Sequence, residues 1–168
     1  MKSTTKQDWD VLLRRLSAGE IPDSEIGSAI VHLSKPLDRQ RVTAAKDTVL
    51  RYLNHQNSWA RHEAMWFINW AKFREEKSAL IEALRNDQDS DNRGFAALCI
   101  AHLMSGTADK ESLNALRATV LSESEDPPVR INAYGALIEI ATNRSGSAFF
   151  VGEKKLEDVD WDWVSKLT

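Results

Sequence analysis

The stretch Asp126-Pro127-Pro128-Val129-Arg130-Ile131-Asn132-Ala133-Tyr134-Gly135-Ala136-Leu137 decides the fold of this chain. Its two prolines suit the entrance of a helix, because the first turn has no internal partners for its N–H groups. Ala133 and Leu137 are four residues apart and share one helix face. A small residue there lets a neighbouring helix approach closely, and the aliphatic residue one turn later fills the space between layers. The stretch therefore predicts a helix packed against other helices.

The same arrangement of an arginine, an alanine three residues later and an aliphatic residue four residues beyond that occurs at two earlier places. The three copies are Arg61-His62-Glu63-Ala64 with Ile68, Arg93-Gly94-Phe95-Ala96 with Ile100, and Arg130-Ile131-Asn132-Ala133 with Leu137. Their arginines are 32 and 37 residues apart, a spacing typical of two-helix solenoid repeats.

The last copy resembles the HEAT and HEAT-like (PBS-lyase type) repeat pattern. The second copy keeps most of that pattern but has Asn92 where an aliphatic residue is preferred, and the first replaces small residues with Trp66 and Phe67. The resemblance covers residues 38–142. It implies an all-α fold, a right-handed α-solenoid (α-α superhelix) of about four antiparallel helical hairpins.

Helical periodicity extends from Asp8 to about Thr142 and indicates about eight helices joined by short polar links. The expected helices cover about 8–19, 22–35, 38–53, 59–73, 75–85, 91–104, 109–121 and 128–141. We expect a single domain over residues 1–168. It would comprise an N-terminal helical pair (1–36), three repeats (37–142) and a C-terminal cap (143–168).

The cap has two interpretations. Terminal repeats must cover an apolar face, and the tail supplies Phe149, Phe150, Trp163, Val164 and Leu167 for this purpose. Alternatively, the tail is an acidic and aromatic patch that recognises a basic partner through Asp158, Asp160 and Asp162. We favour the cap.

The repeated arginines also have two interpretations. Arg61, Arg93 and Arg130 could bind phosphates or acidic partners. Because they recur at one repeat position, we favour a structural ladder in which each arginine pairs with an aspartate of the adjacent repeat.

A working surface is predicted on the second helices, which line the concave side of such solenoids. One face of the first copy carries aromatic residues together with Glu63, and the aligned positions of the later copies differ from it. These positions vary between the copies, whereas the alanine and aliphatic positions described above are constant. The variation suggests a surface adapted to a partner. The predicted partner-binding residues are Trp59, Glu63, Trp66, Trp70, Phe95, His102, Asn132 and Glu139. The alternative is that the tryptophans pack under the N-terminal helices or the tail.

No catalytic, cofactor or metal site is predicted. The histidines are scattered, no glycine-rich phosphate loop is present, and the single cysteine, Cys99, occupies a repeat core position. With 22 basic and 25 acidic residues the net charge is -3, which makes nucleic acid an unexpected partner. The start lacks the apolar run of a signal peptide, and no segment is long enough to span a membrane.

We therefore expect a cytoplasmic, non-catalytic protein-binding module, such as an inhibitor, a bacterial immunity protein, an adaptor or an assembly chaperone. The oligomeric state stays open. The rival hypothesis is an enzyme or nucleic-acid-binding protein on a HEAT-like scaffold. HEAT-like alkylpurine DNA glycosylases use Trp and Asp in a basic groove, and phycobilin lyases share the PBS-type repeats, but neither site is indicated here.

Overall fold

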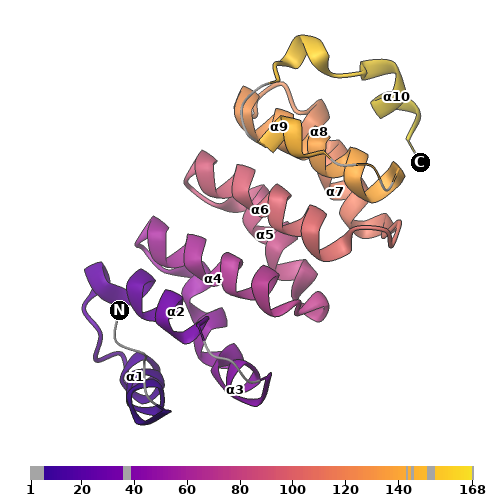
Figure 1. Cartoon of the computed structure of the whole chain (residues 1–168). Helices are drawn as coiled ribbons and strands as arrows, with labels where there is room; N and C mark the ends of the chain where they lie inside the picture. Colours follow the sequence, from indigo (N-terminus) through magenta and orange to yellow (C-terminus); the bar gives the residue numbers. More distant parts are fainter. Residues whose placement is uncertain (1–5, 36–38, 143, 145, 151–153, 168) are drawn as a thin grey trace. The chain divides into compact units, whose positions relative to one another are not determined.

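The computed structural model describes residues 6–35, 39–142, 144, 146–150 and 154–167 (Figure 1). Within these ranges the regular elements are all helices, which confirms the predicted all-α class. The chain forms two compact units, residues 1–72 and 73–168, and each is described by itself. The predicted division at residues 36 and 142 stays a prediction.

The first unit consists of two stacked helical pairs. Helix α1 (Lys6–Ala18) packs on α2 (Ile26–Leu33), which follows the short 3-10 helix η1 (Asp23–Glu25). Helix α3 (Arg39–Leu50), extended by the 3-10 helix η2 (Arg51–Asn54), packs on α4 (Ser58–Ala71). The second helices, α2 and α4, lie side by side.

Side chains of the first unit tie these pairs together. The Trp9 indole N–H donates to the Leu33 carbonyl at 3.3 Å, which joins α1 to the end of α2. The Tyr52 hydroxyl donates to the Leu16 carbonyl at 2.8 Å, which joins η2 to α1. Burial raises the pKa of the Tyr52 hydroxyl above its ordinary value. Leu16 and Ile68 are fully buried in the core of this unit.

Three helix boundaries differ from the sequence-based prediction. Helix α1 begins at Lys6, so Asp8 lies in its first turn, where a negative charge favours the helix dipole, rather than at the cap. The predicted helix over 38–53 tightens into 3-10 geometry from Arg51 onward, as is common at helix ends. Helix α4 ends at Ala71 because Lys72 has a φ of 56°, the left-handed geometry that terminates helices.

The second unit begins with the 3-10 helix η3 (Arg74–Glu76) and α5 (Lys77–Asn86), which pairs with α6 (Ser90–Met104). Helix α7 (Lys110–Leu121) pairs with α8 (Pro127–Thr142). Helix α5 packs beside α7, and α6 beside α8, so first helices stack on first helices and second on second. Cys99 is buried in the core of this unit.

The repeated arginines join the two helices of their own hairpins. Arg61 donates to the His55 carbonyl at 2.8 Å, Arg93 to the Asp87 carbonyl at 2.8 Å, and Arg130 to the Val120 carbonyl at 2.9 Å. Each acceptor lies at the end of the first helix of that hairpin, where carbonyl groups lack helical partners. This geometry supports the structural interpretation over phosphate binding.

The expected carboxylate ladder is present at Arg93, with a different main partner. Arg93 makes a two-pronged ion pair with Glu125, in which Nε and Nη2 donate to the two carboxylate oxygens at 3.0 and 2.7 Å. Asp126, an aspartate of that adjacent repeat, stands farther away at 3.7 Å. The hydrogen bond to Glu125 raises the pKa of Arg93.

The tail lies against α7 and α8 through three short elements, α9 (Ser147–Phe150), η4 (Leu156–Asp158) and α10 (Trp161–Lys166). The rings of Phe149 and Trp163 meet Tyr134 edge-on, with centroids at 4.9 and 5.8 Å. Arg117 of α7 donates to the carbonyls of Val164 and Ser165 at 2.9 and 2.8 Å. The side chain of Phe150, named for the cap, lies outside the described residues.

Two glycines permit the closest approach of the tail. A Cβ on Gly135 of α8 would lie 2.7 Å from the Cβ of Phe149 and 2.9 Å from the carbonyl oxygen of Gly146. A Cβ on Gly146 would lie 2.0 Å from the carbonyl oxygen of Gly135. The backbones therefore touch directly, and neither position has room for a side chain.

Candidate partner-binding surface

Helix α4 presents three tryptophans to solvent. Trp59, Trp66 and Trp70 are 43%, 39% and 41% exposed, whereas Phe67 and Ile68 of the same helix are fully buried. Together with Glu63 the tryptophans follow a spacing of four, three and four residues, which places all four side chains along one helix face. We call these four residues the tryptophan row.

Asn57 fixes the start of α4 and so the direction of this face. Its side-chain oxygen accepts the backbone N–H groups of Trp59 and Ala60 at 2.9 and 3.3 Å, as an asparagine at a helix N-cap does. Ala60 and Ala64, both fully buried, form the opposite, inward stripe. The inward side of α4 also holds Phe67 and Ile68, and the tryptophan row follows the side that faces solvent.

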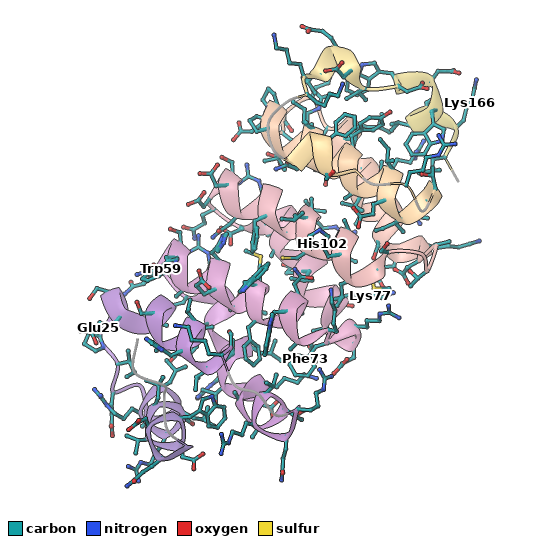
Figure 2. All side chains as sticks on the ribbon, in the orientation of Figure 1. Glu25, Trp59, Phe73, Lys77, His102 and Lys166 are labelled. Carbon is teal, nitrogen blue, oxygen red and sulfur yellow. The ribbon has the colours of Figure 1, made fainter. Side chains whose placement is uncertain are left out.

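Trp59 lies near the start of α4 (Figure 2), and it is packed on one side and 43% exposed. Its indole ring covers Gly27 of α2 so closely that a Cβ there would lie 2.5 Å from a ring carbon. The N–H of the same indole donates to Oε1 of Glu63 at 3.0 Å. Trp59 thus packs on an N-terminal helix, as the alternative interpretation expects, while presenting its remaining surface to solvent.

The other four predicted residues belong to the second unit. Phe95 and His102 lie on α6, where Phe95 is half-buried and His102 is exposed. Asn132 and Glu139 lie on the neighbouring helix α8, and both are half-buried. The side-chain nitrogen of Asn132 would lie 2.7 Å from a Cβ on Gly94, so Asn132 fills the space that this glycine leaves on α6.

In the third repeat, the position that aligns with Trp66 is covered by the C-terminal tail. Gly135 aligns with Trp66, and its surface is occupied by Phe149 and by the backbone of Gly146. From the sequence alone, no contact of the tail with Gly135 was predicted. The packing of a later segment on it had a weak signal, the apolar pair Phe149 and Phe150 after the last long helix.

A charged cluster of the second unit, made of Lys77, Asp109 and Glu111, forms ion pairs between its two hairpins. Lys77 contacts Asp109 at 2.5 Å and Glu111 at 3.1 Å. The hydrogen bond to Asp109 raises the pKa of Lys77. Burial raises the pKa of the Asp109 carboxyl, but hydrogen bonds from Lys77 and Ser112 outweigh burial and leave that pKa below its ordinary value. Asp109 also caps α7 through the Ser112 N–H at 3.0 Å.

Metal-ligating side chains do not gather in the part of the chain that the structure describes: it holds no cluster of three or more His, Cys, Asp or Glu residues. Among the same residues no helix has the length and apolar character needed to cross a membrane.

The two units differ in net charge, although the net charge of the whole chain is only -3. Residues 1–72 contain 11 basic and 8 acidic residues, whereas residues 73–168 contain 11 basic and 17 acidic ones. The acidic excess therefore belongs to the second unit.

Comparison with known proteins supports the repeat assignment. Residues 77–149 match the model of a family described as HEAT repeats. No curated protein matches the chain. The match covers the hairpins α5–α6 and α7–α8 together with α9, whereas the resemblance at residues 38–76 rests on the sequence pattern alone. The described part of the chain is all-α, and over residues 77–149 it is similar to HEAT-repeat proteins.

Proposed function

We propose that this chain is a non-catalytic protein-binding module whose second-helix face, led by Trp66 and Trp70, contacts the partner. HEAT repeats generally mediate protein–protein interactions and generally act as scaffolds without catalytic residues. We assign the contact to this face because the tryptophans of α4 are exposed to solvent.

Single exposed apolar residues need no explanation, but several large ones on one helix face do. Tryptophan is among the residue types most enriched in the energetic centres of interfaces, where its burial removes a large apolar area from water. Trp59, Trp66 and Trp70 each retain roughly two fifths of their surface for such burial. Phe95, His102, Asn132 and Glu139 are proposed as the corresponding contacts of the second unit.

The biological role that we propose is an inhibitor of the immunity type, which neutralises its partner in the cytoplasm. The small size and mildly acidic charge support this role. An adaptor or an assembly chaperone would use the same surface, and the identity of the captured partner distinguishes them.

The test compares partner capture by the wild-type chain and by a Trp66→Ala/Trp70→Ala variant. We expect the variant to keep its helical circular dichroism and to lose at least tenfold in partner affinity, about 1.4 kcal/mol or more. Trp161→Ala is the matched control, since Trp161 is a 39% exposed tryptophan on α10, where its ring packs on Arg130 and lies outside the tryptophan row.

Two results would contradict the proposal. If the Trp66→Ala/Trp70→Ala variant unfolds, the tryptophans serve the core. If Trp161→Ala abolishes binding while the double variant binds normally, the acidic and aromatic tail is the binding surface instead.

A further inference from the structure

The positions of α4, α6 and α8 that align with the tryptophan row include four aromatic and three acidic side chains and no lysine or arginine. Aligning the repeats on their arginines pairs Trp59 with Asp91 and Pro128, and Trp70 with His102 and Glu139. In the same alignment Glu63 pairs with Phe95 and Asn132, and Trp66 pairs with Leu98 and Gly135. Three acids and no lysine or arginine thus occupy twelve aligned positions, although the chain contains 22 basic residues.

Glu63 is the acid that is set among the tryptophans. It lies one turn after Trp59 and one turn before Trp66 on the same face of α4. The Trp59 indole, itself seated on Gly27, holds the Glu63 carboxylate by donating to Oε1 at 3.0 Å. The half-buried Glu63 side chain is therefore hydrogen-bonded to one exposed indole and shares its helix face with a second.

A cationic side chain is the group that this arrangement complements. An incoming guanidinium or ammonium group would pair with the Glu63 carboxylate and lie over the face of an adjacent indole, where cations are attracted to the ring electrons. A phosphate would meet a carboxylate at the same place and be repelled.

We infer that the partner docks on α4 through an arginine or lysine flanked by apolar side chains, with the cation on Glu63 and the apolar groups on Trp66 and Trp70. This inference rests on the proposed function, because it assigns the partner chemistry of the same face.

The experiment selects binders from a displayed library of random peptides on the wild-type chain and on three variants. Glu63→Lys reverses the row charge, and Asp47→Lys makes the same change of charge at an exposed position of α3. The Trp66→Ala/Trp70→Ala variant removes the apolar contacts. Peptides enriched on the wild type should contain an arginine or lysine between apolar residues.

One selected peptide is then measured by titration against these three variants and against a fourth, Glu63→Gln, which removes the charge without reversing it. We expect Glu63→Gln to weaken its binding about tenfold, as for the loss of a charge-assisted hydrogen bond, and Asp47→Lys to change binding less than about twofold. Replacing the peptide's basic residue with glutamate should restore binding to Glu63→Lys, which a merely structural role of Glu63 would not produce.

The two proposals fail in different ways. Selected peptides that lack basic residues, or that bind Glu63→Lys as well as the wild type, overturn the inference while leaving a tryptophan-dependent surface. Peptides that bind the Trp66→Ala/Trp70→Ala variant unchanged, or the absence of any enriched peptide, overturn the proposed function and the inference with it.

Discussion

Asp109 shows how one residue serves both the local and the long-range structure of its unit. Its carboxylate caps α7 and pairs with Lys77, which begins α5, the first helix of the preceding hairpin. Asparagine is an equally good helix cap, but it carries no charge. The Asp109→Asn substitution therefore separates the ion pair from the cap.

We expect Asp109→Asn to lower the free energy of unfolding at pH 7 by about 1 kcal/mol. The pKa of Asp109 is lowered in the folded chain, while an unfolded aspartate titrates near about pH 3.9. The stabilisation is thus present above about pH 4 and is lost as the pH falls through the folded pKa. Urea unfolding between pH 7 and pH 2.5 should show the two chains converging at low pH. A constant difference over that range would contradict the ion pair, and Asp47→Asn is the exposed control.

At the scale of elements, the contact between α8 and α9 depends on backbones that touch. Gly135 and Gly146 allow this approach, and Phe149 then reaches the ring of Tyr134. The four-residue α9 has too few residues to form a stable helix by itself, so its conformation depends on α8.

We expect Gly135→Ala to displace α9, because the new Cβ would lie 2.9 Å from a backbone oxygen that cannot rotate away. The cost should be about 1–3 kcal/mol, as for other overpacked sites, and it should exceed the gain of about 1 kcal/mol from placing alanine in a helix. Hydrogen exchange of residues 147–150 should accelerate, while that of α5 stays unchanged. A variant as stable as the wild type, with unaltered exchange, would show that α8 and α9 are farther apart than described.

At the scale of the whole molecule, Cys99 provides a probe of global opening. It is the single cysteine of the chain, and it is fully buried in α6. Thiol reagents react with the exposed thiolate, so labelling requires the core of the second unit to open. We expect labelling at least about a hundredfold slower in the native chain than in urea, at a rate that follows the unfolding free energy of the second unit. Rapid native labelling would place Cys99 outside the core.

The architecture could be predicted because it depends on repetition. The spacing of Arg61, Arg93 and Arg130, with small and aliphatic residues behind each, carries the hairpin pattern three times. Contacts that depend on single side chains could not be predicted in the same way. Two examples are the packing of Trp59 on Gly27 and the pairing of Arg93 with Glu125 rather than Asp126. Only the structure shows these contacts, because several neighbours fit the sequence pattern equally well.

The Lys77–Asp109 and Arg93–Glu125 ion pairs between the hairpins of the second unit also determine how this unit could be lengthened. Suppose that a second copy of residues 77–109 is inserted after Asp109. Each Lys77 would then again be followed 32 residues later by an Asp109, so every junction between hairpins would regain the lysine–aspartate pair. The arginine pair would not be regained, because Gln88 stands five residues before Arg93, where Glu125 stands five before Arg130. An extended chain would therefore need Gln88→Glu in the inserted copy, and with that one change the unit could serve as a building block for longer arrays.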